Sequence, residues 1–353
     1  MQTSKKDVVK ALIAVACLLA MLIGFSVLII APMIHAGTSY YADADTRKQT
    51  AGDYDFLFIG DSDGLTAFRP SVFDAQTGYT SYNLSGTMMT TETERYLLEK
   101  EIQRNPVKQV VLQFSYETFC RDPEREHGDG NSTTVQRLEN FGECCDFLIR
   151  NVDVDQCLDI HSRLLTAGLS FWKDKLTGNL ETSYDASARG WHCTAGNNLQ
   201  LSDEEVVSAY NRRTLSMEFT YDYTEEIASI FRLCREYNVD ICVVILPVSA
   251  EHIWRIDGWD LFHDWVSDFC ADNRVPMYDF NLYKGKNDLF SDAVSYKDYA
   301  HMSEEGANAF SMAFAQVMQT LSEGKDLSPM FYASYSEMKA DSPYAEIYTR
   351  YNQ

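Results

Sequence analysis

The chain has 353 residues, of which 45% are hydrophobic and 13% aromatic, and it carries a net charge of −22. This length and apolar content argue against a disordered protein and allow one large folded domain or two small ones. The negative charge argues against a nucleic-acid partner and against adhesion to anionic lipid headgroups, and it would repel a polyanionic polymer unless the binding cleft were locally basic or neutral.

A long apolar segment lies near the amino terminus. No charged residue occurs between Ala11 and Met33, and a helix of that length, at ~1.5 Å per residue, crosses a hydrocarbon core of ~30 Å. We therefore predict a transmembrane anchor at residues 11–34. Three lysines precede the segment, whereas two aspartates follow it before the first arginine, so residues 1–10 are expected in the cytoplasm and the rest of this single-pass protein outside the cell membrane.

A cleaved secretory signal is the alternative interpretation of this segment. Ile34-His35-Ala36 would then be a loose cleavage site. The apolar region of a signal peptide usually has ~7–15 residues, fewer than are found here, so the anchor is favoured. Both interpretations export the remainder of the chain.

After a polar tether at residues 35–52, the pattern predicts a folded domain at 53–322. Its first half has strands expected at 54–59, 81–84 and 107–114, with a helix or turn at 67–75 and a helix at 91–105. The near-continuous apolar strand at 107–114 is typical of a parallel sheet with both faces covered. Strands that alternate with helices in this way indicate an α/β domain with a doubly wound sheet.

The regular pattern is interrupted at about 116–205, where we predict an insertion or lid that is more helical than stranded. It resumes with strands at 240–246 and 275–280 and helices at 223–237, 259–273 and 303–321. The last helix should begin after Ser303 as its N-cap. The remaining residues, 323–353, are rich in Tyr and Ser and are expected to wrap over the domain or to dock on a partner.

Eight cysteines follow the apolar segment. An even number is compatible with disulfides in an exported protein, although Cys242 lies in a predicted buried strand, where a free thiol is expected. No Cys-x-x-Cys pair with matching histidines indicates zinc, and no cluster of oxygen ligands follows Asp61 and Asp63. We expect neither a metal nor a cofactor.

The first chemical motif is Gly60-Asp61-Ser62, directly after the first predicted strand. Parallel α/β sheets place their active sites at the carboxyl ends of their strands. A serine in a tight turn there exposes its hydroxyl, and its backbone N–H can face a developing oxyanion. The alternative is a strand-ending turn in which Asp61 or Ser62 simply caps the next helix.

The second motif is Asp298-x-x-His301, just before the last predicted helix. An aspartate and a histidine three residues apart can offer an orienting carboxylate and a base to one serine. A helix-capping or surface histidine is the alternative. The presence of both motifs at these positions favours a catalytic site.

At these residues the sequence resembles the SGNH (GDSL-type) hydrolase superfamily. The resemblance includes Asn83-Leu84-Ser85-Gly86 after the second strand and covers residues 54–115 and 223–321. It implies a flavodoxin-like three-layer sandwich with a five-stranded parallel sheet. It also implies roles for Ser62 as the nucleophile, His301 as the base, Asp298 as its orienting group and Gly86 as an oxyanion donor, with Asn83 beside it.

Within that superfamily, the chain is most similar to membrane-anchored extracytoplasmic proteins that acylate cell-envelope polymers. Examples are the D-alanine transfer protein of teichoic acid synthesis and the O-acetylation proteins of exopolysaccharide systems. One departure concerns the asparagine that the superfamily normally supplies after its third strand, because this chain has Phe114-Ser115-Tyr116 there. Loss of one oxyanion donor typically costs ~10²–10³ in rate. Ser115 or a backbone N–H could take its place.

The resemblance implies an O-acyl esterase or acyltransferase that acts on a cell-surface glycopolymer through an acyl-Ser62 intermediate. The alternative is a catalytically weakened binding module that presents polymer to a membrane-bound O-acyltransferase. His192 and His252 lie near Trp191 and Trp254 in the sequence and could line a sugar-binding cleft. Scattered residues of these types more often pack or lie on the surface.

Overall fold

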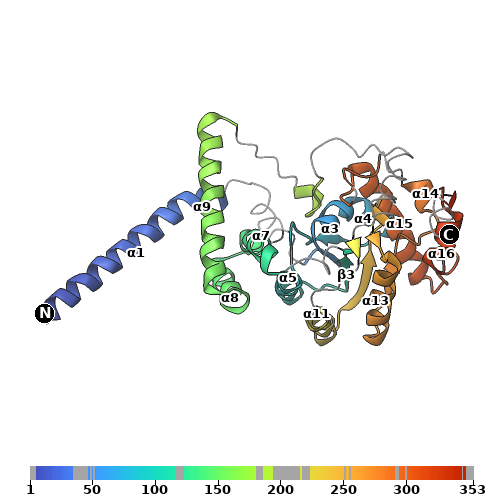
Figure 1. The fold of residues 1–353 in the computed structure, drawn as a ribbon, viewed down its shortest axis with the longest axis horizontal. Coiled ribbons are helices and arrows are strands. Elements are labelled where there is room, and N and C mark those ends of the chain that lie inside the picture. The colour runs from blue at the N-terminus through green and yellow to red at the C-terminus, as the bar shows by residue number, and fades with distance from the viewer. Residues whose placement is uncertain are drawn as a thin grey trace. The chain divides into compact units, whose positions relative to one another are not determined.

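The computed structural model (Figure 1) divides the chain into two compact units. Unit 1 comprises Met1–Thr46 and Val135–Tyr184, and unit 2 comprises Arg47–Thr134 and Asp185–Gln353. The structure describes residues 5–34, 47, 50, 52–116, 123–179, 186–193, 215–216, 223–249, 252–253, 256–290, 294–298, 300–343 and 345–346.

Unit 2 is built on a five-stranded sheet in which every pairing is parallel. Its strands are β1 (Phe56–Ile59), β2 (Ser81–Asn83), β3 (Gln109–Phe114), β5 (Asp240–Ile245) and β7 (Met277–Asp279). They lie in the order β2-β1-β3-β5-β7, which is the strand order of flavodoxin-like folds. The predicted fold class is therefore confirmed, and all five strands were expected from the sequence. A second sheet joins two short strands, β4 (Leu215–Ser216) and β6 (Ile256–Asp257).

Helices cover both faces of the five-stranded sheet. The step from β1 to β2 runs along the sheet in the direction opposite to the next three steps. Right-handed crossovers therefore place the β1–β2 connection on one face and the later connecting helices on the other. The first face carries α3 (Ser62–Ala67), α4 (Pro70–Thr77) and α15 (Glu304–Ser322), and the second carries α5 (Thr91–Arg104), α11 (Thr224–Glu236) and α13 (Trp259–Asp272).

Aromatic side chains fill the core between the sheet and the α4–α15 layer. The ring of Phe58 stacks on that of Phe68 at 4.5 Å, and Phe314 of α15 lies 5.7 Å from Phe73 of α4. All four are at most 1% exposed. Because β1 is buried along its whole length, this core fixes the strand end that carries Ser62.

The described part of the carboxyl-terminal tail is folded onto unit 2. It includes α16 (Tyr335–Asp341) and follows the short α14 (Lys286–Leu289) and α15. The hydroxyl of Tyr335 donates to Asp279 at 2.6 Å and accepts from the Trp259 indole at 2.7 Å. The backbone N–H of Tyr332 donates to the Leu282 carbonyl at 2.8 Å. Of the two predicted roles for the tail, these contacts fit wrapping over the domain.

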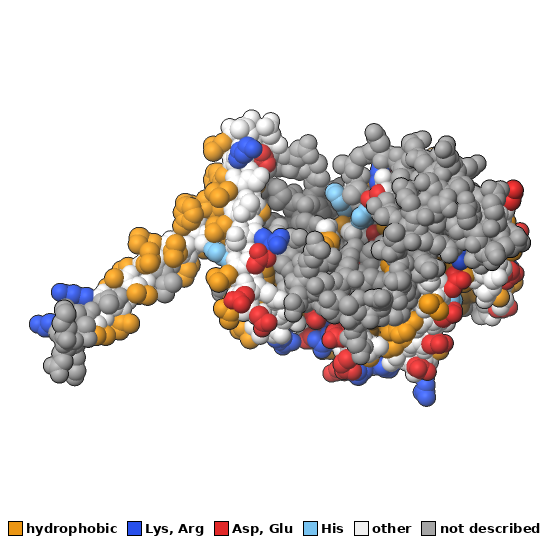
Figure 2. Space-filling view, viewed as in Figure 1, with side chains coloured by type: hydrophobic (Ala, Val, Ile, Leu, Met, Phe, Trp, Pro, Cys, Tyr) orange, Lys and Arg blue, Asp and Glu red, His pale blue; other side chains and the backbone are white. Residues whose placement is uncertain are grey.

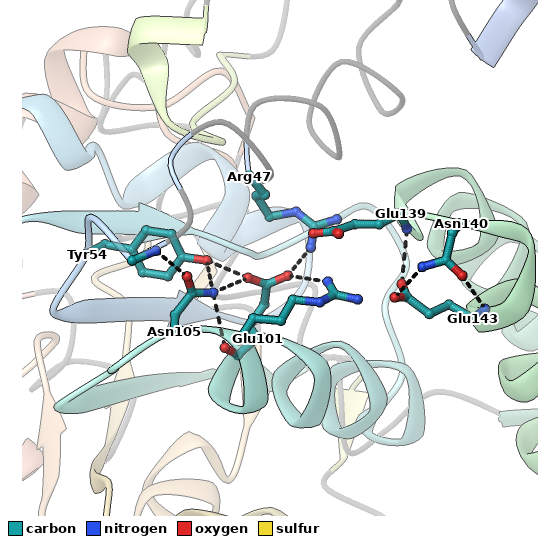
Figure 3. A network of polar contacts seen from close by, with 9 residues as sticks. Arg47, Tyr54, Glu101, Asn105, Glu139, Asn140 and Glu143 are labelled. Carbon is teal, nitrogen blue, oxygen red and sulfur yellow. Dashed lines mark hydrogen bonds and ion pairs between the residues drawn. The ribbon is translucent and has the colours of Figure 1, made fainter.

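A buried polar network attaches the end of the predicted tether to unit 2 (Figure 3). The Arg47 side chain, 2% exposed, forms an ion pair with Glu101, and the Tyr54 hydroxyl donates to the other oxygen of the same carboxylate. Asn105 donates to the Tyr54 hydroxyl at 2.7 Å and accepts from the Gly52 N–H at 2.6 Å. Two described residues of the 35–52 segment, Arg47 and Gly52, are therefore bound to the domain.

In unit 1 the described elements are helical. They are α1 (Lys5–Ile34), α8 (Phe141–Asn151), α9 (Val154–Thr177) and the last residues of α7 (Pro123–Arg137). The helical prediction for the insertion at 116–205 holds over α7, α8 and α9, and its residues 117–122, 180–185 and 194–205 lie outside the described residues. Within α1, Val8–Ile30 is long and apolar enough to cross a membrane, with a mean hydropathy of 2.9. Figure 2 shows hydrophobic side chains along this helix and basic ones at its amino-terminal end.

Candidate active site

Ser62 is the first residue of α3, immediately after the turn that ends β1. The Asp61 carboxylate caps the helix by accepting from the Asp63 N–H at 2.9 Å. At Gly60 an added Cβ would overlap the Gln113 side chain, so the turn has no room for a larger residue there. The turn therefore presents the Ser62 side chain at the carboxyl edge of the sheet, as the sequence predicts.

The neighbouring strand β3 holds this turn through two polar side chains. Gln113 accepts from the Asp61 N–H at 3.0 Å, and the Ser115 hydroxyl donates to the Asp61 carboxylate at 2.8 Å. Asp61 is only 3% exposed, so these bonds occupy polar groups that burial would otherwise leave unsatisfied. Sequence reasoning missed Gln113, whose signal is a buried amide between Leu112 and Phe114 near the end of an apolar run.

The loop before α15 folds Asp298 and His301 towards one another. One oxygen of Asp298 accepts from the N–H groups of Ala300 at 3.0 Å and His301 at 2.8 Å. Ser303 caps α15 by accepting from the Gly306 N–H at 3.1 Å, as predicted. This tight turn fixes both side chains relative to the helix.

The structure brings the three predicted catalytic side chains into one hydrogen-bonded line. His301 Nε2 lies 2.8 Å from Ser62 Oγ, across 239 residues of sequence. On the other side of the ring, His301 Nδ1 lies 2.8 Å from Asp298 Oδ2. Both distances are within the reach that proton transfer requires. This order of nucleophile, imidazole and carboxylate is the arrangement of serine acyl-transfer enzymes.

The surrounding charges favour the protonated imidazole. The hydrogen bond with Asp298 raises the pKa of His301 to about 9 against the opposing effect of burial, and the carboxylates of Asp63 and Asp61 add to the rise. Asp63 Oδ1 lies 3.7 Å from His301 Nε2. Burial alone would raise the pKa of Asp298, but its hydrogen bonds with the side chain and backbone of His301 lower it to about 2. The unliganded site thus holds an imidazolium between carboxylates at neutral pH.

The side chains of two predicted oxyanion-site residues make other contacts. The Asn83 amide donates to the carbonyls of Gly64 at 3.0 Å and Phe68 at 2.8 Å, and its oxygen accepts from the Ser85 N–H at 3.0 Å. The Ser115 hydroxyl is directed to Asp61, as described above. Both side chains therefore hold the turn that carries Ser62, and their predicted roles in the oxyanion site stay predictions.

The predicted oxyanion donor Gly86 is also engaged. Its N–H donates to the Gly60 carbonyl at 3.1 Å, because β1 and the segment after β2 continue their pairing beyond the strand ends. Ser62 has a different environment, since its N–H lies in the first turn of α3, where no intrahelical acceptor exists. The Ser62 N–H, which the sequence analysis also considered, is the remaining candidate among these donors.

The aromatic and histidine residues proposed for a sugar cleft are mostly packed in unit 2. The Trp191 indole donates to the Thr66 carbonyl at 2.8 Å, and the Arg69 guanidinium lies 4.5 Å from the centre of its ring. His252 is 4% exposed and meets Trp259 edge-on at 5.5 Å. His192 is exposed, and Trp254 lies outside the described residues. The packing interpretation therefore holds for Trp191 and His252.

Three described cysteines, Cys234, Cys242 and Cys270, are buried free thiols. Burial raises the pKa of each thiol to about 12. The free core thiol expected at Cys242 is thus confirmed.

Comparison with known proteins finds similarity only among solved structures. No family model and no curated protein matches the chain. A protein from Desulfitobacterium hafniense assigned to the G-D-S-L family of lipolytic proteins has 8% identity and a TM-score of 0.36, covering 74% of this chain and 99% of its own. A Bacteroides fragilis protein assigned as an acylhydrolase has 10% identity and a TM-score of 0.37, covering 81% and 98%.

A GDSL-like lipase from Bacteroides thetaiotaomicron is similar to the same extent. It has 9% identity and a TM-score of 0.38, and the match covers 81% of this chain and all of the lipase. Structural similarity at such low sequence identity and TM-score gives no information about the chemistry of this chain. The function must therefore be argued from the geometry around Ser62.

Proposed function

We propose that this chain is an SGNH-type serine hydrolase or acyltransferase that works through an acyl-Ser62 intermediate. The observation that carries the proposal is the continuous hydrogen-bonded line from Asp298 through His301 to Ser62, with 2.8 Å at each link. A structural histidine at a helix cap would not require a serine hydroxyl on one nitrogen and a carboxylate on the other. The position of Ser62 at the carboxyl end of β1 adds support.

In the proposed reaction, neutral His301 accepts the Ser62 proton on Nε2 while Ser62 Oγ attacks the ester carbonyl carbon. The tetrahedral intermediate collapses as the bond to the leaving oxygen breaks, and that oxygen takes the proton from His301. An incoming water or sugar hydroxyl then gives its proton to His301 as its oxygen attacks the acyl carbon. The bond between that carbon and Ser62 Oγ breaks, and His301 returns the proton to Oγ. Asp298 remains ionised throughout and stabilises the imidazolium.

The Ser62 N–H is the proposed oxyanion donor from this chain. The Asn83, Gly86 and Ser115 donors have other partners in the unliganded site. One fewer donor typically costs ~10²–10³ in rate. A modest turnover is therefore expected, which suits transfer to a bound acceptor if the acceptor excludes water.

We further propose that the enzyme is anchored by α1 and faces the outside of the cell membrane, where its acyl acceptor or donor is a cell-surface glycopolymer. The apolar span Val8–Ile30 and the lysines before it support the anchor and its direction. The substrate class rests on the sequence resemblance to envelope-acylating proteins. A membrane-bound O-acyltransferase is the proposed partner.

The alternative function is a non-catalytic module that binds polymer for such an acyltransferase. Two observations favour it, namely the engaged oxyanion candidates and the imidazolium state of His301 at neutral pH. The alternative does not explain why Ser62 lies within hydrogen-bonding distance of that imidazole.

Turnover of a chromogenic acetyl ester by the full-length protein in detergent separates the two functions. We expect Ser62→Ala and His301→Ala each to lower turnover by on the order of 10⁴-fold or to background. His192→Ala, in an exposed residue, is the matched control and should retain turnover. Equal turnover in wild type and both variants would contradict the enzyme. Addition of glycan acceptors, with the acetylated product measured by mass spectrometry, then distinguishes transfer from hydrolysis.

A further inference from the structure

Helix α9 of unit 1 carries a continuous row of apolar side chains. Val154, Leu158, Leu165, Leu169, Trp172 and Leu176 recur at spacings of three, four or seven residues, which places them on one face of the helix. We call this row the apolar stripe. The polar face beside it carries charged and small polar residues, among them Asp155, Asp159, Arg163, Ser170 and Lys173.

Within the described part of the chain, no layer covers most of the apolar stripe. The exposed fractions are 77% for Val154, 68% for Leu158, 52% for Leu169 and 81% for Leu176. Single exposed leucines are ordinary on protein surfaces, but a full row along a helix of 24 residues marks a surface that contacts something apolar.

The same helix packs against one end of the predicted membrane span. His161 Nε2 lies 3.3 Å from Ser26 Oγ, and Gly168 lies so close to Ile29 that an added Cβ would come within 2.8 Å of its side chain. Phe171 and Trp172 pack with Ile30. All three α1 residues lie in the last turns of the Val8–Ile30 span. The lysines at the other end of the span place this end at the outer surface of the bilayer.

Aromatic and cationic residues lie where α9 meets α1. The Lys175 ammonium is 5.1 Å from the ring centre of Trp172 and 5.7 Å from that of Phe171. Tryptophan and lysine are typical of the interface between hydrocarbon and water, where the apolar part of each side chain is buried and its polar end is hydrated. These residues are therefore consistent with a position of α9 at the outer membrane interface, which is also the position that its contact with the end of α1 indicates.

Figure 2 shows how the two helices of unit 1 are oriented. Hydrophobic side chains gather on the edge of α9 that faces the side from which α1 extends. In this arrangement α9 lies at the outer end of the membrane span, and its apolar edge faces the side on which α1 enters the bilayer. The apolar edge would then contact the lipid acyl chains that surround α1.

We propose that α9 lies along the outer leaflet of the membrane, with its apolar stripe in the lipid interface. The proposal rests on the anchoring by α1 that is part of the proposed function. Because the polar face carries Asp155 and Asp159 as well as Arg163 and Lys173, the apolar stripe supplies the attraction and anionic lipid is not required.

Photocrosslinking in phosphatidylcholine nanodiscs tests the proposal with the full-length chain. Benzoylphenylalanine is placed singly at Leu158 or Leu169 on the apolar stripe, at Arg163 or Ser170 on the polar face, and at Ile23 within α1. All five positions are exposed, so the substitutions should not disturb packing. After irradiation, phospholipid adducts are measured by mass spectrometry.

We expect phospholipid adducts at Leu158, Leu169 and Ile23 and none at Arg163 or Ser170. Adducts at Ile23 but not on the apolar stripe would overturn the inference while leaving the anchor intact. Crosslinks from Leu158 and Leu169 to a second copy or to another protein would overturn it by identifying a different occupant. Absence of lipid adducts at Ile23 would overturn the anchor of the proposed function, and the inference with it.

Discussion

Two carboxylates act on the His301 imidazole from opposite nitrogen atoms. Asp298 lies 2.8 Å from Nδ1, and Asp63 lies 3.7 Å from Nε2, the atom that must accept the serine proton. Asp298 orients the ring and stabilises its charge, as the proposed reaction requires. Asp63 also stabilises the charge, but it does so on the side of the reacting hydroxyl. It therefore adds to the effect of Asp298 on the pKa of His301 and so to the pH at which the base becomes available.

The first prediction concerns the pH dependence of catalysis. The pKa of His301 is raised to about 9, so the neutral base is a minority below that pH, and kcat/KM should rise about tenfold per pH unit until it levels near pH 9. Asp63→Asn removes one of the charges that raise this pKa and should move the rise to lower pH. Esterase profiles from pH 6 to 10 measure both effects.

The control for this variant is Asp63→Glu, which keeps the charge and should retain most of the high-pH rise. A profile of Asp63→Asn that overlays the wild type would show that Asp63 does not act on the base. A flat wild-type profile would contradict the raised pKa of His301.

The second prediction separates two roles for Ser115. Its hydroxyl donates to the buried Asp61 carboxylate at 2.8 Å, so Ser115→Ala removes a hydrogen bond from a buried charge and should lower the free energy of unfolding by about 1–3 kcal/mol. Activity should fall mildly through the less rigid turn. Denaturant unfolding and kcat are measured on the same samples.

A direct oxyanion role for Ser115 predicts the reverse result. Unfolding would then be unchanged while kcat falls by ~10²–10³. Ser115→Thr, which keeps the hydroxyl, serves as the control in both measurements.

At the scale of elements, the geometry of the site depends on the register between β1 and β3 and on the residue at which α15 begins. The pairing of Ile59 with Leu112 sets the ends of β1 and β3 side by side, and this register brings Gln113 and Ser115 to the turn at Asp61. On the other side of the site, the start of α15 packs against the loop that carries Asp298 and His301. A shift in the register of β1 and β3, or in the start of α15, would move Ser62 away from His301.

The third prediction tests the helix start. A Cβ on Gly306 would overlap the Ser295 carbonyl oxygen, which is backbone and cannot move aside independently. Gly306→Ala should therefore destabilise the protein by about 1–3 kcal/mol and reduce esterase activity as His301 shifts. Thermal unfolding and turnover measure the two effects. Met312→Ala, at a 45% exposed position of the same helix, should change stability by less than about 0.5 kcal/mol, and an equal effect of both variants would contradict the prediction.

The elements were predictable from sequence where local pattern decides them. The apolar runs at β1, β3 and β5 and the Ser303 cap are local signals, and the structure has each at the expected place. The roles of Asn83, Gly86 and Ser115 were not predictable, because each depends on which acceptor the register brings within reach. For Asn83 these acceptors are carbonyls of Gly64 and Phe68 in the segment after Ser62. Two-residue strands such as β4 and β6 carry no periodic signal and were missed.

At the scale of the whole molecule, the polypeptide combines an apolar helix with a doubly wound α/β fold. The network around Glu101 marks where the chain enters unit 2. It joins Arg47 to Tyr54, Asn105 and the first turns before β1. An ion pair this deeply buried is costly to break on one side, because the other charge then lacks a partner.

The fourth prediction concerns this entry point. Glu101→Ala removes the buried carboxylate that forms the ion pair with Arg47 and accepts from Tyr54 and Asn105, and it should destabilise unit 2 by about 3–5 kcal/mol. Glu99→Ala, which removes an ion pair with Arg95 at 3.7 Å on the more exposed side of the same helix, should cost at most about 0.5 kcal/mol. Urea unfolding followed by fluorescence compares them. A cost for Glu101→Ala no larger than that for Glu99→Ala would contradict the structural role of the network.

The central claim is that Ser62 is a nucleophile activated by His301, and covalent labelling tests it most directly. The full-length protein is treated with a fluorophosphonate at pH 9, where the base is more available, and the modified peptide is identified by mass spectrometry. We predict one adduct on Ser62, mildly reduced in Ser115→Ala, strongly reduced in His301→Ala and absent in Ser62→Ala. An unlabelled wild-type protein, or a label on another serine, would contradict the claim.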